Sequence, residues 1–101
     1  MIYPEDKRED VINILTEELP MLRAKLGISQ ENLCDIVGIS RQTYSGIETK
    51  KKMSWSVFLS LLMLFTNNEK TAPIIRIAGA FPDDLKESLN ISNRLRRVES
   101  E

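Results

Sequence analysis

Four polar side chains near the middle of the chain have the types and spacing that base recognition in DNA requires. They are Arg41, Gln42, Thr43 and Ser45. A guanidinium can bond guanine, a carboxamide can bond adenine in bidentate fashion, and small hydroxyl side chains can reach base edges or thymine methyl groups. In a helix, Gln42 and Ser45 share one face with Gly46 and Thr49, and this face is almost free of bulk. We expect it to enter the major groove; the alternative is an ordinary solvated helix in a small bundle.

A second group of side chains surrounds this stretch and could hold the sugar-phosphate backbone. It consists of Ser29, Gln30, Ser40, Lys50, Lys51 and Lys52. A lysine run is usually a solvated loop, but this one follows the proposed recognition helix directly and is therefore well placed to meet phosphates. We expect these six residues to contact phosphate.

Two short helices joined by a tight turn would position these groups. In the first helix, Ser29 is placed to cap the N-terminus, and Leu33, Ile36 and Val37 form an apolar stripe at positions i, i+3 and i+4. Gly38 follows as a left-handed stop. A turn this short fixes the angle between the helix before it and the helix after it.

The second helix is expected from Arg41 to about Thr49, capped by Ser40. Tyr44, Ile47 and Glu48 share the face opposite the base-reading residues, so the Tyr44 ring should pack inward. The predicted motif is a helix-turn-helix.

This stretch resembles the N-terminal DNA-binding domain of the Xre, lambda-repressor or Cro-like helix-turn-helix family, over roughly Leu19 to Phe65. The matching residues are Leu22, Arg23, Gly27, Ile28, Ser29, Gln30, Leu33, Gly38, Ile39, Ser40, Arg41, Gln42, Thr43, Ile47 and Glu48. The resemblance implies an all-α fold, a compact five-helix lambda-repressor-like domain with the helix-turn-helix in helices two and three. A short helical C-terminal extension would follow it.

The resemblance also implies that Arg23 and Glu48 form a partly buried, bidentate ion pair that joins the first helix to the recognition helix. Five positions depart from the family pattern, and two of them, Thr49 and Lys50, stand where the family often has Asn-Gly. Cys34 replaces the usual alanine, Tyr44 the usual branched aliphatic residue, and Gly46 a residue that is often long and polar. We expect Cys34 to be a buried packing residue rather than a redox sensor. Gly46 allows close backbone approach but no side-chain readout.

We expect the chain to divide into three segments: an acidic N-terminal extension over 1–16, the DNA-binding domain over 17–68, and a C-terminal helical extension over 69–101. In one interpretation the first segment is a short helix, and the last could serve dimerisation. Pro20 interrupts the apolar pattern that begins at Val11. Either a separate helix stops near Thr16, or Glu17 to Pro20 form the first turn of the next helix. We favour the second alternative, with a first helix from about Glu17 to Leu26.

Three further helices are expected after the motif. They are Trp55 to Phe65 capped by Ser54, then Glu69 to Ala80 with Thr71 as cap, and then one or two turns from Asp84 to Leu89. The helix from Trp55 is apolar on most of its circumference. We expect its large side chains to fill the core. Any surplus apolar face, for which the candidates are Trp55, Phe58, Leu62 and Phe65, would be covered by a partner.

Composition excludes several classes of protein. The 101 residues are 42% hydrophobic and 29% charged, which fits one small domain with short tails. No run of 18 apolar residues exists, and the acidic, polar N-terminus does not resemble a signal peptide, so we expect a cytoplasmic protein without membrane association. One cysteine and no histidine leave no familiar zinc constellation or His-based triad. We therefore expect no enzyme activity, no metal, no cofactor and no small-molecule ligand.

The net charge of −1 is unevenly distributed. Residues 1–19 carry two basic and six acidic groups, a net charge of −4. Residues 20–56 carry six basic and three acidic groups, a net charge of +3, and residues 57–101 carry six of each, a net charge of 0. Positive charge is thus concentrated in the segment expected to neutralise phosphates.

The sequence predicts a DNA-binding transcriptional regulator, expected to be a repressor, that acts as a homodimer on a pseudo-palindromic site in double-stranded DNA. Two alternatives remain open. One is the DNA-binding antitoxin of a toxin-antitoxin pair, with a toxin or another regulator as protein partner, which a neighbouring toxin-like gene would favour. The other is a protein-interaction module that has lost DNA binding.

Overall fold

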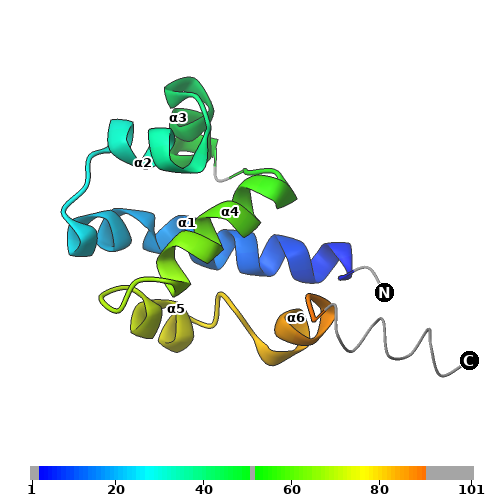
Figure 1. Cartoon of the computed structure of the whole chain (residues 1–101). Coiled ribbons are helices and arrows are strands. Elements are labelled where there is room, and N and C mark those ends of the chain that lie inside the picture. The colour runs from blue at the N-terminus through cyan, green and yellow to red at the C-terminus, as the bar shows by residue number, and fades with distance from the viewer. Residues whose placement is uncertain (1–2, 51, 91–101) are drawn as a thin grey trace, which may run out of the picture.

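The computed structural model describes residues 3–50 and 52–90, and these residues form six helices and no strand. The helices are α1 (Glu5–Leu26), α2 (Gln30–Val37), α3 (Arg41–Lys50), α4 (Trp55–Thr66), α5 (Ala72–Ala78) and α6 (Asp83–Ser88). In Figure 1, α1 runs across the middle, α4 crosses it, α2 and α3 lie above, and α5 and α6 lie below. The all-α prediction is confirmed.

Helix α1 corrects one sequence-based expectation. It is a single helix of 22 residues with Pro20 inside it, so the start expected at Glu17 is wrong. Proline lacks the N–H that would bond the carbonyl four residues earlier, and its ring crowds that carbonyl, an effect of about 3 kcal/mol. Leu15 and Leu19 before this position and Leu22 after it are fully buried, whereas Pro20 itself is exposed. Burying each such side chain contributes about 1.5 to 3 kcal/mol, which outweighs the defect.

Replacing Pro20 with alanine should therefore stabilise the protein. We expect Pro20→Ala to raise the free energy of unfolding by about 1 to 2 kcal/mol, because alanine restores the missing donor at an exposed position. Urea denaturation measures the change. Met21→Ala, at the neighbouring exposed position, is the control and should change stability less. A less stable Pro20→Ala protein would show that proline is required for the local geometry.

The core lies between α1 and α4. Ser54 caps α4 as expected, because its hydroxyl accepts a hydrogen bond from the Val57 N–H at 3.2 Å. The large side chains of α4 fill the core as predicted, and Phe58, Leu61, Leu62 and Phe65 are all buried. Trp55 is half-buried and stacks on Phe58 with ring centroids 4.9 Å apart.

Helix α5 lies within the segment where a helix was expected, and α6 begins at Asp83, one residue before its expected start. Thr71 precedes α5, but its hydroxyl donates to the Phe65 carbonyl at 2.6 Å instead of capping the helix, so the predicted cap bond is absent. Asp84 in α6 accepts bonds from the Tyr3 hydroxyl and the Lys7 ammonium, each at 3.0 Å. These contacts tie the last described helix to the beginning of α1.

Helix α5 packs on both α1 and α4. The division into segments 1–16, 17–68 and 69–101 nevertheless stays a prediction. The charged terminal stretch with Arg94, Arg96 and Arg97 lies outside the described residues, as does Lys51. No helix among residues 3–50 and 52–90 has the length and apolar character needed to span a bilayer.

Candidate nucleic-acid interface

The turn between α2 and α3 forms as the local sequence predicts. Gly38 has a φ of 77°, in the left-handed region, and its N–H donates to the Cys34 carbonyl at 2.8 Å. The Ile39 N–H donates to the same carbonyl at 3.0 Å. The Ser40 hydroxyl then accepts from the Thr43 N–H at 3.0 Å and so caps α3. Three residues thus redirect the chain and hold both helix ends.

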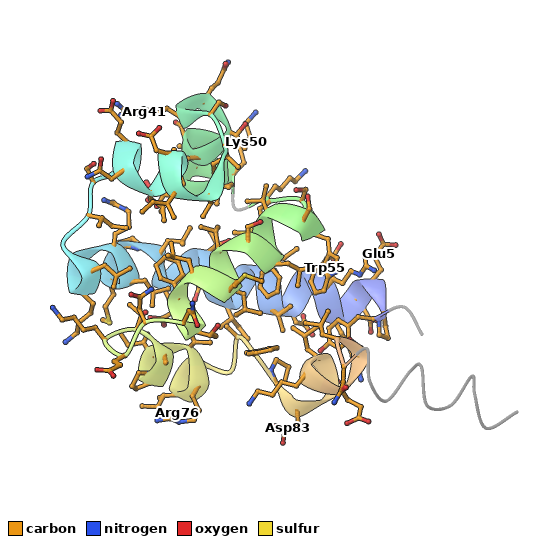
Figure 2. The ribbon with its side chains drawn as sticks, in the orientation of Figure 1. Glu5, Arg41, Lys50, Trp55, Arg76 and Asp83 are labelled. Carbon is orange, nitrogen blue, oxygen red and sulfur yellow. The ribbon has the colours of Figure 1, made fainter. Side chains whose placement is uncertain are left out.

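The two faces of α3 differ in polarity. Tyr44 and Ile47 point inward and are each 1% exposed. The residues expected to read bases all lie on the exposed side of the helix, namely Arg41, Gln42, Thr43 and Ser45. Figure 2 shows Arg41 and Lys50 directed away from α1, at the end of the molecule formed by α2 and α3.

Arg41 and Gln42 keep their hydrogen-bonding groups available. Within residues 3–50 and 52–90, neither side chain makes a hydrogen bond to another protein group. Thr43 differs, because its hydroxyl oxygen accepts from the Ser40 hydroxyl at 2.9 Å. The guanidinium and the carboxamide can therefore meet a base edge without first breaking an internal bond.

The residues expected to contact phosphate fall into three groups. Lys50 and Lys52 are exposed cations near the C-terminal end of α3. Ser29 and Ser40 are exposed but serve as helix caps, Ser29 by accepting from the Asn32 N–H at 3.1 Å. The Gln30 carboxamide donates to a Glu48 carboxylate oxygen at 3.2 Å, a contact within the protein. Phosphate binding by these residues stays a prediction.

A polar network connects α1, α2 and the inward side of α3. The Arg23 guanidinium donates through Nε to the Tyr44 hydroxyl at 3.1 Å, and that hydroxyl donates to Glu48 Oε1 at 2.9 Å. The direct approach between Arg23 Nη2 and Glu48 Oε1 is 3.7 Å. The pair expected between Arg23 and Glu48 exists, but the expected bidentate geometry is wrong. The Nε–H group of Arg23 donates to the Tyr44 hydroxyl and not to a second oxygen of Glu48.

The Tyr44 phenol is held further from ionisation than an ordinary phenol. Burial first, and then the hydrogen bond to the Glu48 carboxylate, together raise the pKa of Tyr44 to about 12, since ionisation would place two negative charges together. The phenol is therefore a permanent donor to Glu48 and acceptor from Arg23 near neutral pH. Glu48 in turn receives bonds from both α2 and α3, which fixes the orientation of α3 relative to its neighbours.

Sequence patterns did not reveal two members of this network. Tyr44 was expected only to pack its ring, and Gln30 was assigned only to phosphate. The spacing of Tyr44 and Glu48, one turn apart on the inward face, was the available signal for the first contact. No signal existed for Gln30, because it reaches Glu48 across 18 residues of chain.

Cys34 packs between the two helices of the motif. Its side chain is 2% exposed and its Sγ lies 3.9 Å from the Ser40 carbonyl oxygen. Burial raises the pKa of the Cys34 thiol, although the nearby Arg41 charge opposes this effect. A protonated, buried thiol is a poor nucleophile, which agrees with the packing role expected for this residue.

Comparison with known proteins gave one match. Residues 21–54 match the family model described as "Helix-turn-helix". The matched segment begins within α1, includes all of α2 and α3, and ends immediately before α4. No curated protein and no solved structure matched the chain.

Proposed function

We propose that the protein is a sequence-specific repressor of transcription that binds DNA through a helix-turn-helix of the Xre and lambda-repressor type. The match of residues 21–54 to the helix-turn-helix family model supports a DNA-binding regulator. The observation that carries the proposal is the outward face of α3. Its four polar side chains are exposed while Tyr44 and Ile47 are buried, so the helix presents hydrogen-bonding groups on a fixed support.

In the proposed complex, α3 lies in the major groove. Gln42 would bond the N6 and N7 atoms of adenine, Arg41 would reach guanine or a phosphate, and Thr43 and Ser45 would contact base edges or thymine methyl groups. Lys50, Lys51 and Lys52 would hold the phosphates beyond the end of α3, together with Ser29 and Ser40 at the helix caps.

Gln30 can serve both the protein and the DNA. A carboxamide nitrogen carries two N–H groups, and the bond to Glu48 uses one of them. The second N–H remains to donate to a phosphate oxygen. Gln30 would thereby link the backbone of the DNA to the network that orients α3.

The protein would act as a homodimer. One helix-turn-helix contacts only a short half-site, and the modest positive excess of residues 20–56 favours weak binding by one copy. Two copies related by a two-fold axis would place their recognition helices about 34 Å apart, one turn of DNA. The expected operator is therefore a pseudo-palindrome.

Selection from a randomised duplex library, carried out at two salt concentrations and followed by sequencing, tests this function. The proposal predicts an enriched inverted repeat whose retention falls as salt rises, because phosphate contacts release counterions. A protein that retains no DNA even at low salt would contradict it and would favour the interaction-module alternative. An enriched site together with a toxin-like partner would instead favour the antitoxin alternative.

Substituting Gln42 tests the assignment of base readout. We expect Gln42→Ala to reduce the preference for the enriched duplex over a scrambled duplex by about 1 to 3 kcal/mol, because a bidentate contact to adenine is lost. Fluorescence anisotropy with both duplexes measures the preference. Lys52→Ala is the matched control, and it should weaken binding to both duplexes equally. If Gln42→Ala also weakened both equally, Gln42 would be a phosphate contact.

A further inference from the structure

A hollow of about 450 Å³ lies between the first half of α1 and the segment around the end of α3. Two of its lining residues, Lys50 and Lys52, are cations that the proposed function assigns to phosphate binding. The α1 side is formed by Glu9, Ile12 and Asn13, which share one face of the helix at positions i, i+3 and i+4. This hollow, which we name the lysine hollow, therefore brings a carboxylate together with two of the proposed phosphate-binding lysines.

The carboxylate of Glu9 is not neutralised by any contact within the part of the chain that the structure describes. Its side chain is exposed and forms neither a hydrogen bond nor an ion pair there, and the same is true of Lys50 and Lys52. A hollow of this volume is comparable in width to the distance over which salt screens charges, about 10 Å at 0.1 M. The negative charge of Glu9 therefore acts on any anion that the two lysines hold.

The lysine hollow is a place where two segments of opposite charge meet. Glu9 belongs to residues 1–19, which have a net charge of −4, and the two lysines belong to residues 20–56, which have a net charge of +3. The first half of α1 also precedes residues 21–54, the segment that matches the helix-turn-helix model. The carboxylate is thus brought to the proposed phosphate-binding lysines by a part of α1 outside the matched segment.

We propose that Glu9 attenuates phosphate binding by Lys50 and Lys52 and so limits the sequence-independent affinity for DNA. A phosphate that approaches the two ammonium groups is attracted by them and repelled by the Glu9 carboxylate. The repulsion is the same for every duplex, because all base sequences present the same phosphates. A larger share of the affinity for a matched site then has to come from base contacts. The inference rests on the proposed function in naming DNA as the anion, but the repulsion itself is measurable with any polyanion.

Elution of the full chain from a heparin column in a salt gradient tests the repulsion without requiring a DNA site. We expect Glu9→Gln, which removes the charge and keeps the size of the side chain, to elute at higher salt than the wild type. Asn13→Asp, which adds a second carboxylate to the lysine hollow, should elute at lower salt. Both residues are exposed, so neither substitution should unfold the protein, and circular dichroism verifies this.

Fluorescence anisotropy with the enriched and the scrambled duplex extends the test to DNA. We expect Glu9→Gln to raise the affinity for both duplexes about two- to fivefold at low salt, the range typical of exposed charges. The gain should shrink as salt rises, because added ions screen the carboxylate from the phosphate. A gain confined to the enriched duplex would overturn the inference, since Glu9 would then act on base readout.

Glu18→Gln is the matched control, because it removes the same charge from the same helix. Glu18 lies nine residues after Glu9, on the opposite side of α1, and it does not line the lysine hollow. We expect Glu18→Gln to elute from heparin close to the wild type. In a protein that carries Lys50→Ala and Lys52→Ala, the gain from Glu9→Gln should disappear.

Three results on heparin would each overturn the role of Glu9. They are an unchanged elution of Glu9→Gln, an equal gain from Glu18→Gln, and a gain that survives the loss of both lysines. A wild-type protein that retains no duplex at low salt, while Glu9→Gln still elutes later from heparin, would instead contradict the proposed function. The attenuation of anion binding by Glu9 would then stand without DNA as its target.

Discussion

Glu48→Ala should lower the free energy of unfolding by about 2 to 4 kcal/mol, because the substitution leaves a charged group and a buried phenol without their acceptor. The Arg23 side chain is 21% exposed, and the Tyr44 residue is 1% exposed. Breaking a fully buried ion pair removes more, about 3 to 5 kcal/mol, but here partial exposure lets water replace some of the lost interaction. Urea denaturation followed by circular dichroism measures the change.

Glu48→Gln is the control that separates charge from hydrogen bonding. The carboxamide oxygen can still accept from the Tyr44 hydroxyl, so the loss should be roughly half as large or less. Equal losses in the two variants would show that the negative charge matters more than the acceptor. A Glu48→Ala protein as stable as the wild type would contradict the view that this network orients α3.

Phe58→Ala should have the largest effect on stability, a loss of about 3 to 5 kcal/mol. The ring is completely buried between α1 and α4, and it stacks on Trp55. Removing it takes away the transfer free energy of the side chain and leaves a cavity that the two helices cannot fully close. Small domains are stable by only about 5 to 15 kcal/mol, so a substantial fraction of this variant should be unfolded at elevated temperature.

Thermal denaturation measures the effect, and Phe81→Ala supplies the comparison. Phe81 is only partly buried and packs at the edge of the core, so the same chemical change should remove much less stability. If both variants lost the same amount, the core would not be centred on α4. If Phe58→Ala were fully stable, the arrangement of α1 against α4 would be wrong.

Local patterns predicted most of the helix-turn-helix. Caps at Ser29, Ser40 and Ser54 and the left-handed Gly38 depend on residues within four positions of each other, and all four form as expected. The inward and outward faces of α3 follow from helical periodicity alone. Such features need no knowledge of the remaining chain, which is why the sequence was sufficient.

Features that depend on contacts between distant residues were harder to predict from the sequence. The sequence indicated a break near Pro20, but burial of Leu15 and Leu19 against the rest of the core keeps α1 continuous. The bond from Gln30 to Glu48 and the insertion of Tyr44 beside Arg23 also depend on how helices pack. A propensity describes one segment, whereas these outcomes depend on the free energy of the whole fold.

The outward side of α4 shows the same limitation. The sequence predicted an excess of apolar surface there and named Trp55, Phe58, Leu62 and Phe65 as its candidates, with core packing favoured. The last three are buried, and Met63 is the large apolar residue of α4 that remains exposed. Composition revealed that α4 has more apolar surface than the core needs, but the packing of α4 on α1 decides which of its apolar side chains remain exposed.

Whether the outward face of α3 reads DNA is tested by mapping which backbone amides respond to DNA. Two-dimensional NMR spectra of the isotope-labelled protein, recorded while the selected duplex is added, report the amides separately. We expect the largest shifts at Arg41, Gln42, Thr43 and Ser45, with smaller shifts near Ser29 and Lys52. Shifts confined to α1 or α6, or no shifts at low salt, would show that the outward face of α3 does not read DNA.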